Sequence, residues 1–104
     1  MAKYVFVYHG GKKSSTPEAG QQVMAEWGAW FEKLGPAVID GGNPLGPSKT
    51  VRPGGEVQND GGSNPASGYS LIEASSIEDA TEKAKGCPIL KRGGNIEVAE
   101  AMEM

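Results

Sequence analysis

The residues best suited to chemistry are one histidine and two carboxylates. His9 is the only histidine of the chain, and it ends a β-branched and aromatic run just before Gly10-Gly11. An imidazole changes its protonation state near neutral pH, and a neighbouring carboxylate can orient it as a general base. We expect Glu97 beside His9, since the last strand should run antiparallel to the first, with Asp40, at another strand end, as a second candidate. The alternative is a histidine that only packs and hydrogen-bonds at a strand end.

Four other residues are candidates for ligand binding. Lys49 and Arg52 lie in a Gly- and Pro-rich segment, residues 41–68, and are suited to contact a carboxylate. Trp27 either forms the wall of an aromatic site or belongs to the core, as aromatics at helical spacing usually do. Glu100 interrupts an apolar row, which predicts a pocket acid or an interface ion pair. If its strand lies at a sheet edge, Glu100 simply reaches water.

The remaining reactive groups give weaker signals. Cys87 is the only cysteine, so no internal disulfide can form. It lies near the C-terminal end of a predicted helix, where the dipole disfavours a thiolate, and we interpret it as a small buried hydrophobe. One histidine with scattered carboxylates is a poor metal signal, so we expect neither a metal nor a cofactor. The loop at residues 10–15, GGKKSS, has amides and lysines that attract anions, but we interpret it as a solvated loop.

Patterned segments on both sides of residues 41–68 indicate how these groups are positioned. Alternation and β-branched content predict strands over residues 3–9, 37–40, 68–75 and 96–104. Caps and 3.6-residue periodicity predict helices over residues 17–34 and from 77 to about 86. The order is βαββαβ, which predicts an α+β, ferredoxin-like fold: an antiparallel four-stranded sheet with two helices on one face.

The first strand predicts an assembly. Both of its faces are largely apolar, whereas two helices cover only one face of such a sheet. An exposed sheet of Phe and Val side chains is unfavourable, so we expect a homodimer that packs sheet against sheet. The alternative is that residues 41–68, which contain eight Gly and four Pro, fold over the open face. Apart from a short strand around residues 50–57, we interpret that segment as a long loop acting as a lid.

Composition limits the classes of protein. The 104 residues suit one domain, residues 1–104, and the net charge of −3 argues against nucleic-acid or anionic-membrane binding. No apolar stretch has the ~18 residues of a membrane span, and the first residues lack the apolar core of a signal peptide. We therefore expect a cytoplasmic protein.

Several strings resemble one family across nearly the whole chain. They are the opening KYVFVYHGG, the helix string QQVMAEWGAWFEKLG, then GGNPLGPSKTV, GGSNPASGYSLIEASSIEDATEKAKGCPIL and the closing GGNIEVAEAMEM. Together they resemble the YCII-related (DGPF) domain family. The resemblance implies a dimeric α+β barrel, in which ferredoxin-like protomers pair through their sheets and each has a pocket beside the sheet.

The resemblance does not carry over the family's proposed chemistry. Some members have a histidine on the first helix and an aspartate just before the proline that follows the second helix, a proposed acid–base dyad. Here the first position falls near Met24 and the second is Cys87. We therefore expect a small-molecule-binding homodimer of the YCII-related type that lacks the dyad. The alternative is a lyase- or isomerase-like enzyme that uses His9 on a small anionic or aromatic metabolite, so the residues leave open whether the chain is an enzyme.

Overall fold

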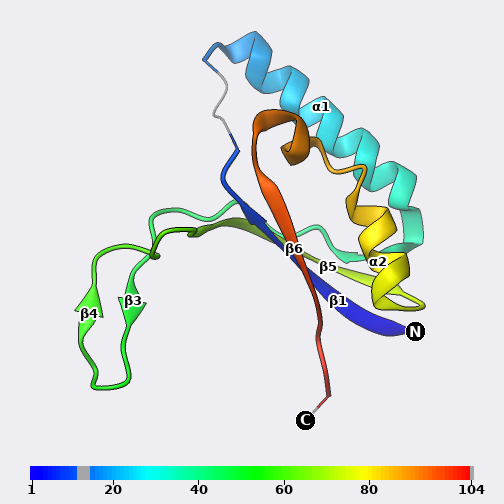
Figure 1. Ribbon diagram of the computed structural model, residues 1–104. Coiled ribbons are helices and arrows are strands. Elements are labelled where there is room, and N and C mark those ends of the chain that lie inside the picture. The colour runs from blue at the N-terminus through cyan, green and yellow to red at the C-terminus, as the bar shows by residue number, and fades with distance from the viewer. Residues whose placement is uncertain (12–14, 104) are drawn as a thin grey trace.

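The computed structural model describes residues 1–11 and 15–103, so part of the loop at residues 10–15 lies outside the described residues. Two helices lie over a four-stranded sheet, and a short hairpin extends from the sheet (Figure 1). The strands are β1 (Ala2–His9), β2 (Val38–Asp40), β3 (Thr50–Val51), β4 (Val57–Gln58), β5 (Ala66–Ala74) and β6 (Asn95–Glu100). The helices are α1 (Pro17–Leu34) and α2 (Ile77–Ala84), with 3-10 turns at Gly35–Ala37 and Pro88–Arg92.

The main sheet has the strand order β2-β5-β1-β6, and all its pairs are antiparallel. This order and the two helices confirm the predicted α+β, ferredoxin-like fold. The inner strand β1 pairs with β5 on one side, where Phe6 is opposite Ser70, and with β6 on the other, where Phe6 is opposite Val98. β1 and β5 are therefore the two inner strands of the sheet.

The hydrophobic core lies between the sheet and the helices. Tyr4, Phe6 and Tyr8 alternate along β1 and are all buried, as the period of two along a strand requires. Phe6 stacks on Trp30 of α1, with ring centroids 6.1 Å apart. Ala80 and Ala84 of α2 belong to the same core, so both helices cover the same face.

Local signals set the ends of α1, which runs over the predicted range. The Thr16 side chain accepts a hydrogen bond from the Ala19 amide at 3.1 Å, and Pro17 occupies the first turn. At the other end, Gly35 has a φ of +58°, a conformation that excludes most side chains and stops the helix.

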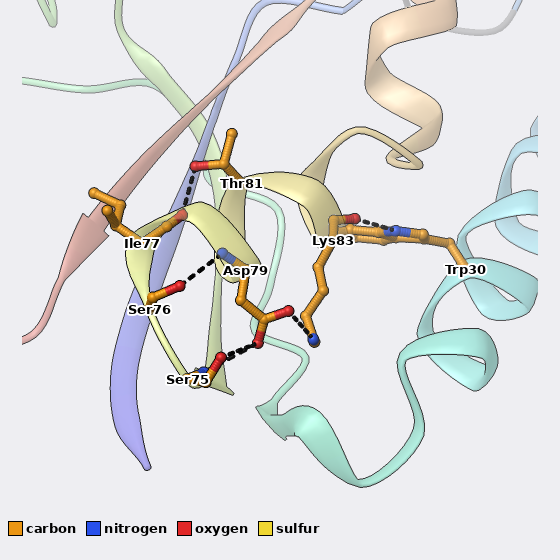
Figure 2. A network of polar contacts seen from close by, with 7 residues as sticks. All are labelled: Trp30, Ser75, Ser76, Ile77, Asp79, Thr81 and Lys83. Carbon is orange, nitrogen blue, oxygen red and sulfur yellow. Dashed lines mark hydrogen bonds and ion pairs between the residues drawn. The ribbon is translucent and has the colours of Figure 1, made fainter.

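A polar network holds α2 against its surroundings (Figure 2). The Ser76 hydroxyl caps the helix by accepting from the Asp79 amide at 3.1 Å. The Asp79 carboxylate accepts in turn from Lys83 Nζ at 2.8 Å and from the backbone amide of Ser75 at 3.0 Å. These hydrogen bonds, that from Lys83 above all, lower the pKa of Asp79 to about 2. Trp30 Nε1 donates to the Lys83 carbonyl at 3.2 Å, which ties α2 to α1.

Two predicted elements differ clearly from the observed ones, whereas the other boundaries agree to within about two residues. The last strand was expected to reach residue 104, but β6 ends at Glu100, opposite Tyr4 of β1, and only one further backbone hydrogen bond, from Ala101 to the Lys3 carbonyl at 2.9 Å, follows within the described residues. The strand expected around residues 50–57 is instead the hairpin of β3 and β4, because Pro53 and the glycines after it form a turn.

Within the described residues, no helix has the length and apolar character needed to cross a membrane.

Candidate functional site

A cavity of about 530 Å³ lies between α1 and the edge of the sheet formed by β2 and β5. Its volume falls in the range of small-molecule sites, ~300–1,000 Å³. Three stretches of chain supply most of the lining, one face of α1, the segment that follows β2 and the start of β5, while β1 and the Pro88–Arg92 turn add one residue each. The lining residues are Tyr8, Val23, Met24, Trp27, Gly28, Phe31, residues 41–44, residues 67–69 and Ile89.

Aromatic rings dominate the walls. Trp27 meets Tyr8 edge to face, with ring centroids 4.9 Å apart, and lies 5.9 Å from Phe31. Helical spacing places Val23, Trp27 and Phe31 on one face of α1, four residues apart. Such ring arrangements are favourable beyond the area they bury, so these walls are well defined.

A hydrogen-bonded chain fixes the side of the cavity next to the sheet. The Tyr8 hydroxyl donates to Ser70 Oγ at 2.7 Å, and Ser70 Oγ donates to the Gly41 carbonyl at 2.6 Å. Burial raises the pKa of Tyr8, so its hydroxyl keeps its proton and stays a donor. Ser70 is fully buried, and the chain therefore links β1, β5 and the segment after β2.

Glycine permits the close approach of that segment to β5. Gly42 has a φ of +75°, and a Cβ atom there would lie 1.7 Å from the Tyr69 carbonyl oxygen. Backbone hydrogen bonds continue the contact, from Tyr69 to the Asn43 carbonyl at 3.3 Å and from Leu45 to the Ser67 carbonyl at 3.0 Å. Residues 41–45 are thus an ordered rim of the cavity.

His9 and Glu97 come together, but not in the cavity. His9 Nε2 lies 3.0 Å from Glu97 Oε1, and His9 Nδ1 lies 3.0 Å from the Asn64 carbonyl oxygen. His9 is buried, whereas the Glu97 side chain is 64% exposed. Since neighbouring residues of a strand point to opposite faces, Tyr8 faces the helices and His9 the open face of the sheet.

Asp40 does not join this pair. It lies on β2, which is separated from β1 by β5. Its carboxylate accepts from the Gly42 amide at 2.8 Å and so stabilises the turn at the cavity rim.

The three charged candidates for ligand binding lie outside the cavity. Arg52 donates to Gln58 Oε1 at 2.6 Å within the hairpin, and Lys49 is exposed just before β3. Glu100 is exposed on the edge strand β6, in line with the interpretation that it reaches water. It lies opposite Tyr4, whose pKa is raised by burial and, to a smaller extent, by Glu100. Of the four ligand-binding candidates, only Trp27 lines the cavity.

Several residues that line the cavity were not predicted as site residues: Tyr8, Phe31, Tyr69 and residues 41–44. The spacing of Val23, Trp27 and Phe31 was the one available signal. No sequence signal indicated that β5 would line the cavity, because its position depends on which strands pair.

Two other features bear on chemistry. Burial raises the pKa of the Cys87 thiol to about 11, so the side chain behaves as a small hydrophobe. Across residues 1–11 and 15–103, no three His, Cys, Asp or Glu side chains are grouped as metal ligands.

No family model, curated protein or solved structure matches this chain. Of the fold that the resemblance to the YCII-related family implies, the structure shows the antiparallel four-stranded sheet with two helices.

Proposed function

We propose that this chain is a homodimeric protein of the YCII-related type that binds a flat, largely apolar aromatic small molecule. The observation that carries the proposal is the cavity of about 530 Å³ between α1 and the β2–β5 edge, with its aromatic walls.

The shape and chemistry of the lining favour an aromatic ligand. Rings from α1 and β1 border the space, and a flat ring inserted there gains offset or edge-to-face contacts with Tyr8, Trp27 and Phe31. At the rim, the exposed Asn43 side chain is free to offer a ligand a polar contact, because the Tyr69 hydroxyl, to which its Nδ2 donates, is 3.4 Å away.

The position of His9 favours binding over acid–base chemistry. A general base must come within hydrogen-bond reach of the proton it removes. Both ring nitrogens of His9 face protein oxygens, and the imidazole lies on the sheet face opposite the cavity. A ligand in the cavity is therefore out of reach of this side chain.

The open face of the sheet supports the homodimer. Val5 and Val7 of β1 lie beside Leu71 and Tyr69 of β5 there, and they are only partly buried within one chain. Face-to-face packing of two copies removes these side chains from water, at ~25 cal/mol for each Å² of apolar surface.

Titration with indole as a flat probe tests the binding proposal. Gly28 lines the cavity and has open space around it, so Gly28→Leu fills the cavity without removing a contact. We expect saturable indole binding by calorimetry, and an affinity at least tenfold weaker in Gly28→Leu. The matched control is Ala29→Leu, an exposed position of α1 outside the lining, which should bind like the wild type.

Two results contradict the proposal. One is equal indole affinity in Gly28→Leu and the wild type, which places the probe elsewhere. The other is no saturable binding of indole, naphthalene or benzoate by the wild-type protein.

A further inference from the structure

The hairpin of β3 and β4, with residues 49–60 forming what we name the arm, stands clear of both helices and of the main sheet (Figure 1). Its two strands form a separate two-stranded sheet. The Cα radius of gyration is 14.9 Å, compared with ~13 Å for a compact chain of this length. An isolated two-stranded hairpin is at best marginally stable in water, so the arm needs a surface to pack on.

One face of the arm is apolar and uncovered. Val51 and Val57 are directly opposite each other across the two strands, and they are 70% and 57% exposed. The other face is polar and satisfied internally, since Arg52 donates to Gln58 and the Thr50 hydroxyl donates to the Asp60 carbonyl at 2.7 Å. This pattern is typical of a strand pair with one face against another surface.

The base of the arm is firmly attached to the domain. At Gly61, a Cβ atom would lie 2.6 Å from the Pro65 side chain and 2.9 Å from that of Ser48, so the two stems of the arm pass in close contact. The Asn64 carbonyl is held by His9 Nδ1 at 3.0 Å, next to the start of β5. The arm therefore leaves the domain in a set direction.

The sheet face alone offers little area for a dimer. The eight residues of β1 span ~26 Å, and four strands span ~19 Å. The outer strands are shorter, with three residues in β2 and six in β6. The face thus covers less than ~500 Å² in projection, whereas a stable interface takes ~800 Å² from each partner.

We propose that the arm packs Val51 and Val57 against a second copy of this chain, extending the interface formed by the two open sheet faces. This inference rests on the homodimer of the proposed function. A two-fold axis brings both arms into equivalent contacts, so one apolar hairpin per chain contributes twice. The arm supplies the area that the sheet face lacks.

The dimer dissociation constant tests the arm directly. Val51→Thr with Val57→Thr keeps β-branched side chains in both strands but removes apolar contact, and sedimentation velocity over a dilution series measures the result. We expect a dissociation constant at least tenfold higher than that of the wild type. The matched control is Ile77→Thr, an exposed position on α2 outside the arm and the open face, which should leave it unchanged.

The outcomes separate the two proposals. A dimeric wild type with an unchanged constant in the arm variant overturns the role of the arm and leaves the homodimer standing. A monomeric wild type overturns the homodimer and the arm together, while indole binding is decided separately.

A second measurement does not depend on altered apolar contacts. The variant Glu56→Cys carries a spin label on the exposed turn of the arm and contains no ¹⁵N. It is mixed with ¹⁵N-labelled wild-type protein, which carries no spin label. Broadening of amide signals in the labelled copy, on its open sheet face and the margins of that face, supports the proposal. A dimer without such broadening contradicts it.

Discussion

His9 Nε2 and Glu97 Oε1 lie 3.0 Å apart across the neighbouring strands β1 and β6. The same imidazole reaches the Asn64 carbonyl through Nδ1, so it joins the edge strand to the base of the arm. Tyr8, one residue earlier, turns to the other face and anchors the cavity through Ser70. Two adjacent residues of β1 therefore organise the two sides of the sheet.

Replacing either member of the pair should affect stability unequally. His9→Ala removes a buried ring with two hydrogen bonds, and we expect a loss of ~2–3 kcal/mol in the free energy of unfolding. Glu97→Ala should cost less than ~1 kcal/mol, because the carboxylate is mostly exposed and water replaces it. Urea unfolding of both variants measures this. Equal losses would show that the contact between the two side chains, and not burial of the ring, provides the stability.

Glycine-to-alanine changes at two cavity residues should change the free energy of unfolding in opposite directions. Gly42→Ala places Cβ against the Tyr69 carbonyl at a positive φ, and we expect a loss of at least ~2 kcal/mol. Gly28→Ala lies within α1 with free space around it, and should gain ~0.5–1 kcal/mol from helix propensity. Thermal and urea unfolding report both. A tolerated Gly42→Ala would mean that the rim at residues 41–45 is not closely packed on β5.

Asp79 should make stability fall in acid. Its pKa is held at about 2, below its ordinary value of 3.8, so its hydrogen bonds stabilise the fold fully above about pH 4. That contribution should disappear as the pH falls from about 4 through about 2, when the carboxylate takes up a proton. Unfolding measured against pH in Asp79→Asn should lack this part of the acid dependence. An unchanged profile would assign the acid sensitivity to other carboxylates.

Local signals were enough for the helices and for the order of elements. Thr16, Pro17 and Gly35 define α1 through hydrogen bonds and φ values that involve only near neighbours. The end of β6 was missed because alternation continues to residue 103, whereas the pairing with β1 stops at Glu100. Propensity cannot report where another strand ends.

The candidate site was predictable only in pieces. The pairing of His9 with Glu97 followed from antiparallel neighbours, and Trp27 followed from its residue type. The charged residues Lys49 and Arg52 were predicted to lie in a lid, but in the structure they belong to the arm and lie outside the cavity. A Gly- and Pro-rich composition indicates an irregular segment without giving its direction.

The sequence specified the two helices, the four strands of the main sheet, the face on which each strand residue lies and the incomplete coverage of that sheet by two helices. It did so because periodicity and capping depend on contacts within a few residues. The three-dimensional structure alone shows that residues 41–45 pack on β5 to enclose a cavity and that residues 49–60 project as an arm. Those features depend on approaches between residues far apart in the chain, such as Gly42 and Tyr69, and such approaches exist only after the strands have paired.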